Sequence, residues 1–372
     1  MLIGVPKEIK NHEYRVGLTP TSVREFIAHG HDVLVETNAG GGIGSSDEIY
    51  QFAGAQIVGD PAEIFAKAEL IVKVKEPQAA ERQMLRPDQV LFTYLHLAPD
   101  PDQTRDLVNS GAVCIAYETV TDGHGGLPLL APMSQVAGRL SIQAGASALE
   151  RAKGGRGILL GGVPGVAPAK VVVIGGGVVG ENAIYMALGM AADVTVLDRR
   201  VDVLARLAQR FGAALKTVYS TRASLEDYVL QADLVIGGVL IAGAEAPKLV
   251  TRDMVKRMKP GAVLVDVAID QGGCFETSHM TTHAEPTYVV DGVVHYCVAN
   301  MPGAVPHTST HALNNVTLPY ALALADKGYQ KALLENPNFL EGLNVCKGKI
   351  TYRAVAEDLG YEYVDPRVAL ES

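Results

Sequence analysis

Short runs of β-branched and other apolar residues alternate along the chain with longer segments whose apolar positions recur at helical spacing. In the N-terminal part, the apolar runs predict strands and the longer segments predict helices. The predicted strands are Leu2–Val5, Asp32–Glu36, Leu70–Val74, Val90–Tyr94 and Val113–Tyr117, and the predicted helices are Thr21–His29, Pro61–Lys67 and Pro101–Ser110. Strands that alternate with helices build βαβ units, so this part predicts an α/β fold with a mainly parallel sheet.

A second alternating series follows. A long helix is predicted over Ser134–Ala152, and Gly154–Pro168 contains too many glycines and prolines for regular structure. The predicted strands of the second series are Lys170–Ile174, Asp193–Leu197, Leu215–Val218, Leu234–Ile236 and Val263–Val267, separated by helices at Val178–Ala191, Val201–Phe211, Ala223–Gln231 and Thr251–Met258. This repeat is typical of a doubly wound nucleotide-binding domain.

The C-terminal part departs from this alternation. After Val298 prolines punctuate the chain, and His311–Lys327 predicts a long helix. The later predicted helices, Lys331–Leu334 and Tyr352–Leu359, are too few to bury a core of their own. We therefore expect them to pack on the first α/β domain.

The chain is thus predicted to form two doubly wound, mainly parallel α/β domains with a cleft between them. A Rossmann-type domain covers 131–304, and a discontinuous domain covers 1–130 and 305–372. The length of 372 residues fits two domains of roughly 100–200 residues each.

Composition and charge exclude several classes of protein. Hydrophobic residues make up 48% and charged residues 20% of the chain, an ordinary balance for a folded protein. The net charge of −9, without a basic run, argues against binding to nucleic acid or an anionic membrane. We see no signal-peptide pattern and no apolar stretch of about 18 residues, so we expect a cytoplasmic protein.

The cysteines do not form a metal or redox motif. The four residues are Cys114, Cys274, Cys297 and Cys346, and none lies in a CxxC pair. We expect buried free thiols, and no zinc site.

The strongest local motif is glycine-rich. Gly175, Gly177 and Gly180 follow the predicted strand Lys170–Ile174 and open a predicted helix, and Asp198 lies at the end of the next strand. In a dinucleotide-binding fingerprint the first glycine allows a tight turn and the second lets the backbone approach a pyrophosphate. The third lets helix and strand pack closely. The alternative is a turn-forming glycine cluster beside a surface aspartate.

The aspartate bears on cofactor choice. A carboxylate at Asp198 would accept hydrogen bonds from the adenosine ribose and repel a 2′-phosphate, which favours NAD over NADP. Arg199 and Arg200 follow directly and could accommodate that phosphate, so the strictness of the preference stays open.

An ordered set of further motifs resembles bacterial alanine dehydrogenases along essentially the whole chain. The matching stretches are Gly4–Asn11 with Glu13–Val16, Val74–Pro77, Thr93–His96, Pro132–Ser134, Gly161–Gly165, the glycine fingerprint, Ile269–Gly273 and Val298–Gly303. The family is also similar in part to the NAD-binding subunit of proton-pumping transhydrogenase. The resemblance implies reversible NAD-dependent oxidation of L-alanine to pyruvate and ammonia, a split substrate domain, and a homohexamer.

The resemblance assigns four residues to the chemistry. Arg15 and Lys75 would bind the substrate carboxylate or carbonyl, and a guanidinium suits a carboxylate because it offers two parallel donors. His96 would donate and accept protons, since its ordinary pKa lies near neutrality. Asp270 would activate water or ammonia and face His96 across the cleft.

Three of these residues follow predicted strands at their carboxyl ends, where ligands of doubly wound sheets gather: Lys75, His96 and Asp270. Without the resemblance, Arg15 and Lys75 would be surface charges, His96 a surface or structural histidine, and Asp270 a turn residue.

The resemblance also implies the cofactor contacts. These are Ser134, Gly175, Gly177, Val178, Val179, Gly180, Asp198, Ser220, Val239, Leu240, Val267, Ala268, Ile269, Asp270, Val298, Ala299, Asn300 and Met301.

Some positions depart from the family pattern. Val203 replaces a residue that is often basic near the adenosine end, and His307 replaces a frequent arginine. There is no acid/histidine pair near Ala323 and Lys327, where some relatives bind magnesium, so we predict no metal. Two alternatives remain: an NAD(H)-binding module of a transhydrogenase-like complex, and a related dehydrogenase that acts on a larger amino acid.

Overall fold

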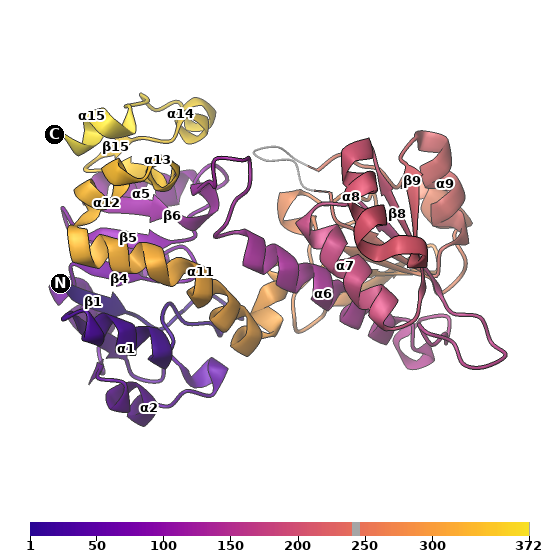
Figure 1. Cartoon of the computed structure of the whole chain (residues 1–372), viewed down its shortest axis with the longest axis horizontal. Helices are drawn as coiled ribbons and strands as arrows, with labels where there is room; N and C mark the ends of the chain where they lie inside the picture. Colours follow the sequence, from indigo (N-terminus) through magenta and orange to yellow (C-terminus); the bar gives the residue numbers. More distant parts are fainter. Residues whose placement is uncertain (240–245, 372) are drawn as a thin grey trace. The chain divides into compact units, whose positions relative to one another are not determined.

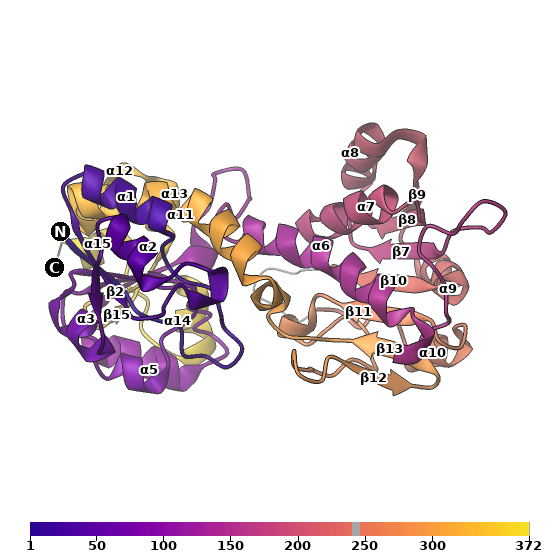
Figure 2. The same ribbon diagram turned by 90° about the horizontal axis from the view of Figure 1, so that it is seen from below.

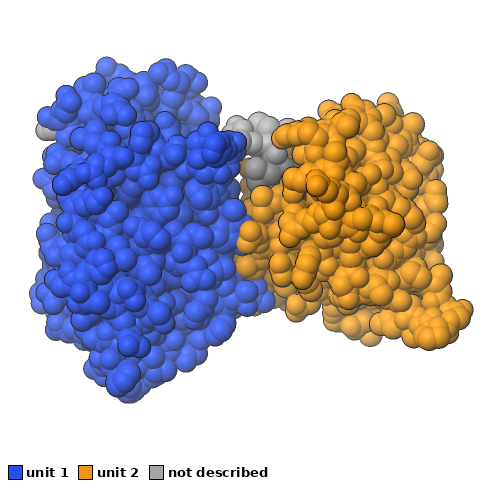
Figure 3. All heavy atoms as spheres, in the orientation of Figure 1, with its two compact units in different colours: residues 1–133, 305–372 blue, residues 134–304 orange. Residues whose placement is uncertain are grey.

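The structure is a computed structural model that describes residues 1–239 and 246–371. The chain forms two compact units, coloured separately in Figure 3. Unit 1 comprises residues 1–133 and 305–372, and unit 2 comprises residues 134–304. Unit 1 is therefore built from both ends of the chain.

Unit 1 contains an eight-stranded sheet in the order β15-β14-β6-β5-β4-β1-β2-β3. Its strands are β1 (Leu2–Val5), β2 (Asp32–Glu36), β3 (Gln56–Val58), β4 (Leu70–Val72), β5 (Val90–Thr93), β6 (Val113–Ala116), β14 (Leu343–Cys346) and β15 (Lys349–Ile350). Strands β1 to β6 pair in parallel, and the C-terminal strand β14 pairs antiparallel with β6. The order reverses between β1 and β4, which is where doubly wound sheets bind ligands.

Helices cover both faces of this sheet (Figures 1 and 2). They are α1 (Pro20–Ala28), α2 (Asp47–Phe52), α3 (Pro61–Lys67), α4 (Ala79–Arg82), α5 (Pro101–Ser110), α11 (Pro306–Lys327), α12 (Tyr329–Glu335), α13 (Pro337–Leu340), α14 (Arg353–Leu359) and α15 (Pro366–Leu370). Buried side chains of α3, α5 and α14, among them Phe65, Leu107 and Val355, share one core with the strand residues Leu91 and Val345. The C-terminal segments thus complete the core of unit 1.

Unit 2 contains a seven-stranded sheet in the order β12-β13-β11-β10-β7-β8-β9. Its strands are β7 (Lys170–Ile174), β8 (Asp193–Asp198), β9 (Leu215–Tyr219), β10 (Leu234–Gly237), β11 (Val263–Asp266), β12 (Thr287–Val290) and β13 (Val293–Tyr296), and only β12 is antiparallel to its neighbour. Its helices are α6 (Ala131–Ala148), which starts within unit 1, α7 (Val178–Gly189), α8 (Val201–Phe211), α9 (Arg222–Gln231) and α10 (Arg252–Arg257). In Figure 2, α9 and α10 lie on the face of the sheet opposite to α7 and α8.

The predicted fold class is confirmed, because the parallel strands of both units follow the doubly wound order 3-2-1-4-5-6. Several predicted boundaries were wrong by a few residues. The strand predicted to end at Val74 ends at Val72, because the backbone N–H of Val74 donates to the Glu8 carboxylate instead of continuing the ladder. The helix predicted from His311 begins at Pro306, since a proline suits the first turn of a helix.

The predictions for the cysteines and the membrane concern local features. All four cysteines are buried free thiols, as expected. No helix in residues 1–239 or 246–371 is both long and apolar enough to cross a bilayer.

Candidate active site

The carboxyl ends of β4, β5 and β6 lie at one edge of the sheet of unit 1. Lys75 follows β4, His96 follows β5, and Glu118 follows β6. The neighbouring strand ends are joined by hydrogen bonds: Thr93 Oγ1 donates to the Lys75 carbonyl at 3.0 Å, and the Tyr94 N–H donates to the Val74 carbonyl at 3.2 Å. The segments that carry Lys75 and His96 are therefore fixed beside each other.

Arg15 is a buried cation with a bidentate carboxylate partner. Its Nε and Nη2 donate to the two carboxylate oxygens of Glu13 at 2.7 and 2.6 Å, and Nη1 lies 3.0 Å from the sulfur of Met133. Burial alone would lower the pKa of Arg15, but the contacts with Glu13 raise it above its usual value, so the group stays charged. Because only 2% of Arg15 is exposed, the alternative of a solvated surface charge is wrong.

Lys75 lies on a backbone held by a second acidic residue. One carboxylate oxygen of Glu8 accepts the N–H groups of Val74 and Lys75, at 2.7 and 3.3 Å, and the other lies 3.1 Å from Nζ of Lys73. Lys73 also donates to Glu81 at 2.7 Å. The half-buried Lys75 thus follows a buried, charge-paired network that fixes the end of β4.

His96 projects from a strained turn that Glu118 holds. Its φ of 51° lies in the left-handed region, and its backbone N–H donates to Oε1 of Glu118 at 2.6 Å. The same oxygen lies 3.8 Å from Nδ1 of the imidazole. The ring stacks on Tyr94, with an interplanar angle of 6° and 5.8 Å between centroids, while 43% of the side chain stays exposed. The turn therefore fixes the imidazole beside a carboxylate that can stabilise its protonated form.

Tyr94 connects the histidine with the buried arginine. Its hydroxyl donates to the Leu129 carbonyl at 2.6 Å, and burial raises its pKa while the nearby Arg15 charge opposes that rise. Unit 1 thus gathers Arg15, Lys75 and His96 around the ends of β4 and β5.

Two acidic partners in this unit, Glu13 and Glu118, were not predicted from the sequence. Glu118 follows a predicted strand at the same edge, and Glu13 lies two residues before Arg15. These two positions in the sequence were the only signals from which the acidic partners could have been predicted.

In unit 2, the glycine fingerprint has the predicted turn geometry. Gly175 has a φ of +95°, which glycine adopts without strain. A Cβ on Gly180 would lie 1.8 Å from the Gly175 carbonyl oxygen, whereas a Cβ on Gly177 would have no atom within 4 Å. Gly180 is therefore required for close packing, and Gly177 leaves open space at the N-terminus of α7.

Asp198 lies at the end of β8 beside this loop. Its Oδ2 accepts the N–H of Gly176 at 2.7 Å, and its Oδ1 accepts the N–H of Arg200 at 2.8 Å. The guanidinium of Arg200 pairs with Asp202 at 2.5 Å. The carboxylate is therefore oriented by backbone groups of the fingerprint loop and of the turn after β8.

The other predicted cofactor residues of unit 2 follow neighbouring strands. Val239 follows β10, Val267–Asp270 follow β11, and Val298–Met301 follow β13, so the structure brings these segments to one edge of the sheet. The exposed Asp270 accepts the backbone N–H of Asn300 at 3.3 Å, which joins two of them.

Two further predicted cofactor contacts, Ser134 and Ser220, do not follow β10, β11 or β13. Ser134 is half-buried in the first turns of α6, and Ser220 follows the edge strand β9, where its N–H donates to the Asp198 carbonyl. Leu240 lies outside the described residues.

These features fit a dinucleotide. The open space at Gly177 follows β7, beside the switch point between β7 and β10, and the oriented carboxylate of Asp198 ends the neighbouring strand β8. Val203 lies beside the fingerprint loop, because a Cβ added to Gly176 would lie 2.7 Å from Val203 Cγ1. The ring of His307 lies 4.5 Å from that of His311, whose Nδ1 is 2.8 Å from the His307 carbonyl oxygen, and neither contact explains this departure from the family pattern.

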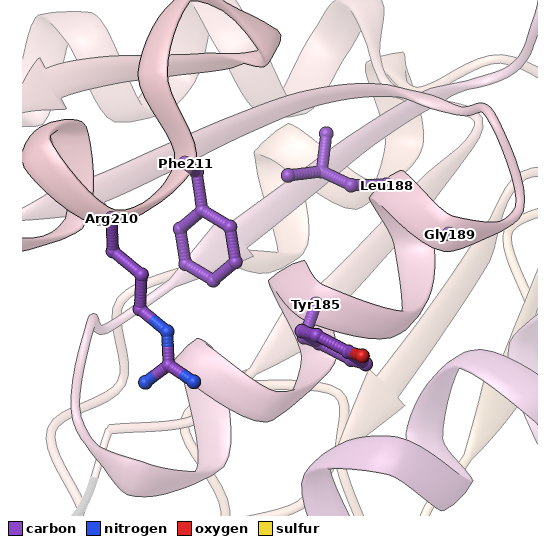
Figure 4. A pocket seen from close by; sticks show the side chains of 5 residues that line it. All are labelled: Tyr185, Leu188, Gly189, Arg210 and Phe211. Carbon is purple, nitrogen blue, oxygen red and sulfur yellow. The ribbon is translucent and has the colours of Figure 1, made fainter.

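A cavity of about 450 Å³ lies elsewhere on unit 2 (Figure 4). It is lined by Tyr185, Leu188 and Gly189 of α7 and by Arg210 and Phe211 of α8. These residues lie toward the C-terminal ends of both helices, away from the fingerprint at the start of α7. Among the described residues, no three His, Cys, Asp or Glu side chains are grouped to hold a metal.

The fold and these sites define a two-unit α/β protein with a dinucleotide-binding fingerprint and a charged strand edge. Comparison with known proteins gives the particular family. The chain belongs to the alanine dehydrogenase/PNT family, whose N-terminal domain matches residues 4–137 and whose C-terminal domain matches residues 141–353.

Individual relatives match along the whole chain. A curated alanine dehydrogenase from Halomonas elongata is 64% identical over 365 residues, 98% of each chain. The solved structure of an L-alanine dehydrogenase superposes with a TM-score of 0.94 at 52% identity, covering 97% of this chain and 99% of that one. A transhydrogenase from Sinorhizobium meliloti shares the fold, with a TM-score of 0.82 at 24% identity, covering 95% and 100% of the two chains.

Proposed function

We propose that the protein is an NAD-dependent alanine dehydrogenase that converts L-alanine to pyruvate and ammonia reversibly. The observation that carries the proposal is the charged edge of unit 1. There Glu118 holds His96 in a left-handed turn, close to the buried cation Arg15 and to Lys75. The 64% sequence identity to a curated alanine dehydrogenase, over 98% of each chain, supports L-alanine as the substrate.

Arg15 and Lys75 bind the carboxylate of alanine. The Glu13 carboxylate orients the guanidinium plane of Arg15, and Glu8 fixes the backbone under Lys75. Because these partners are already in place, little side-chain freedom is lost when substrate binds.

Asp270 and His96 accept and donate the protons that the reaction moves. When the amine carbon has been oxidised to an iminium, Asp270 orients and deprotonates the attacking water, and its negative charge stabilises the cation. His96 then accepts the hydroxyl proton as the carbinolamine collapses, and Asp270 returns the proton that it took from water to the departing amine, so that pyruvate and ammonia form. Glu118 stabilises the imidazolium that results, since its carboxylate lies 3.8 Å from Nδ1.

Unit 2 holds NAD, which supplies the hydride acceptor when bound. The N-terminus of α7 with Gly175, Gly177 and Gly180 takes the pyrophosphate, and Asp198 takes the ribose hydroxyls. The segments after β10, β11 and β13 form the nicotinamide end.

Asp198 also makes NAD the preferred cofactor over NADP. Its carboxylate is fixed by two backbone N–H groups, and a 2′-phosphate there would meet a negative charge. Arg200 is paired with Asp202, so its charge is compensated. The pairing of Arg200 supports NAD over NADP, and Arg199 keeps the strictness of this preference open.

The units have separate tasks in this proposal. Unit 1, residues 1–133 and 305–372, forms the substrate domain, and unit 2, residues 134–304, forms the NAD domain. A homohexamer remains a prediction from the family, which size-exclusion chromatography with light scattering would test, and a cytoplasmic location remains a prediction from the sequence.

A spectrophotometric assay tests the function directly. Purified protein is mixed with L-alanine and NAD at alkaline pH, which favours oxidation because the reaction releases a proton, and NADH absorbance is followed. An amino-acid panel, each member run with NAD and NADP, separates alanine dehydrogenase from an enzyme of a larger amino acid. Absence of turnover with every amino acid, combined with NADH binding, would instead indicate a binding module.

Two substitutions test the assigned roles. We expect His96→Ala and Asp270→Asn each to lower kcat at least ~100-fold, the usual contribution of a positioned acid or base. His124→Ala, at an exposed loop histidine, is the matched control and should leave kcat unchanged. Near-normal turnover in either active-site variant would remove that residue from the mechanism.

A further inference from the structure

A buried aspartate lies directly beneath the loop that carries Asp270. It is Asp266, the last residue of β11, and none of its surface is exposed. The loop leaves the sheet after Asp266, passes through a short 3₁₀ turn at Ile269–Gln271, and returns through Gly272 and Gly273. A buried carboxylate is costly unless donors surround it, so its partners indicate what it does.

The partners of Asp266 come from both ends of this loop. Oδ1 accepts the N–H of Ala268 at 3.2 Å, just before the 3₁₀ turn. Oδ2 accepts the N–H groups of Cys274 and Phe275 at 2.9 and 3.3 Å, just after the glycines. Oδ2 also accepts the hydroxyl of Ser278 at 2.6 Å. One carboxylate therefore joins the start of the loop to its end.

A glycine in the loop leaves space for the Asp266 carboxylate. Gly273 has a φ of +77°, and a Cβ there would lie 2.6 Å from Oδ2 of Asp266. The loop is closed by its own bonds as well, because the N–H of Gly273 donates to the Ala268 carbonyl at 3.1 Å. Asp270 lies at the exposed tip of a loop whose base is fixed by Asp266.

The same carboxylate reaches the second predicted nicotinamide segment. Ser278, which donates to Asp266, lies 3.7 Å from the sulfur of Cys297 at the end of β13. The following residues include Asn300, whose N–H donates to Asp270 at 3.3 Å. Asp266 is thus linked to both segments that contact or carry Asp270.

We propose that Asp266 is a positioning residue for the reaction, which holds the Asp270 carboxylate in place by clamping both ends of its loop. This rests on the proposed function, in which Asp270 acts on the substrate. The carboxylate is needed because it is an acceptor only. In Asp266→Asn one oxygen becomes an NH2 group, and either orientation of the amide places a donor against the donors of one loop end.

The test is a double-substitution cycle in the full-length enzyme. We measure kcat for alanine oxidation in the wild type, Asp266→Asn, Asp270→Asn and the double variant. We expect Asp266→Asn to lower kcat about 10–100-fold in the wild-type background, in line with the loss of charged hydrogen bonds. In the Asp270→Asn background it should lower kcat less than about 3-fold, because there is no carboxylate left to position.

A merely structural role gives a different result. It would lower kcat by the same factor in both backgrounds, and that outcome overturns the proposal, as does a kcat of Asp266→Asn within 2-fold of the wild type. Asp253→Asn is the matched control, since 78% of this α10 side chain is exposed, and it should change nothing. Unchanged turnover in Asp270→Asn alone would instead refute the proposed role of Asp270, and the clamp with it.

A second variant and a second readout cover the case in which Asp266→Asn does not fold. Ser278→Ala removes one donor and keeps the carboxylate, and we expect a smaller kcat loss that also vanishes in the Asp270→Asn background. Hydrogen exchange in the cofactor-free protein should accelerate for peptides spanning residues 267–274 and not for those spanning β7. Unchanged exchange at 267–274 in both variants would overturn the clamp, whatever the activity.

Discussion

Two glycines of the fingerprint should respond to alanine in opposite ways. At Gly180 a Cβ would lie 1.8 Å from the Gly175 carbonyl oxygen, although contacts below 3.0 Å essentially do not occur. The turn and α7 would have to separate by at least 1.2 Å, the difference between these two distances. At Gly177 a Cβ meets nothing within 4 Å, and its φ of −68° and ψ of −164° suit alanine.

The expected magnitudes follow from these contacts. Overpacking costs ~3 kcal/mol when the obstacle is rigid backbone, and the higher helix propensity of alanine offsets ~1 kcal/mol of it. Gly180→Ala should therefore destabilise unit 2 by ~2 kcal/mol, or about 4–8 °C in Tm. Gly177→Ala should change Tm by less than about 2 °C, because the weaker helix cap and the stiffer unfolded chain roughly cancel.

Binding should show the reverse sensitivity. A methyl group at Gly177 occupies the space into which the pyrophosphate would fit, and we expect NADH to bind at least ~10-fold more weakly, or ~1.4 kcal/mol. Thermal unfolding measures the first effect. The second is measured from the emission of NADH itself, since the chain has no tryptophan to act as an energy donor. Equal loss of Tm in both variants, or wild-type NADH affinity in Gly177→Ala, would refute this interpretation of the fingerprint.

Three further predictions concern single side chains. Glu118→Gln should lower kcat about 10-fold or more, because the adjacent imidazolium loses its counter-charge, while KM for alanine stays within a few-fold; an unchanged kcat would contradict the role of Glu118. Asp198→Ala should lower kcat/KM with NAD about 10-fold or more. Asp202→Asn should release Arg200 and raise kcat/KM with NADP relative to kcat/KM with NAD. If this ratio is the same in the wild type and both variants, Asp198 and Arg200 do not set the cofactor preference. Burial lowers the pKa of His295, so the folded protein favours the neutral ring. The neutral ring contributes its full stabilisation above pH 6.5, the ordinary pKa of histidine. As the pH drops below 6.5, the free energy of unfolding falls by up to about 1.4 kcal/mol per pH unit. His295→Gln should flatten the decline of Tm between pH 7 and pH 5, and identical slopes would show that other groups cause the decline.

The parts of the fold that the sequence predicted well are those with local signals. The strands β1, β2 and β7 and the helices α3, α5 and α8 have the predicted bounds. The hairpin of β12 and β13 was missed although its signal was present: Asp291–Gly292 lies between two β-branched runs, and both residues have positive φ, 49° and 79°.

Other strands depend on partners that no local pattern specifies. β3 and β15 contain three and two residues, and they extend the sheet only because a neighbouring strand is already in place. β14 pairs with β6, more than two hundred residues away, and supplies Val345 to the core. Such pairings depend on tertiary structure, so propensity cannot predict them.

The candidate site likewise contains residues with a local sequence signal and residues that depend on tertiary contacts. Lys75, His96 and Asp270 lie in loops that follow the carboxyl ends of β4, β5 and β11, where ligands of such sheets gather, and their roles stay predictions. The residues that hold these loops, Glu118 and Asp266, were not predicted. A carboxylate becomes a clamp only when donors from distant segments converge on it, which a sequence pattern alone does not reveal.

The pairing of β14 with β6 has a consequence for the order of events during synthesis. When the ribosome has completed β6, that strand has no neighbour on one side, and its unpaired N–H and C=O groups offer a template for other strands. The partner emerges only after all of unit 2 has been made, so unit 2 can fold while the N-terminal half of unit 1 is still incomplete. A nascent or truncated chain that ends before Leu343 should therefore be prone to aggregation through β6, even though unit 2 is complete.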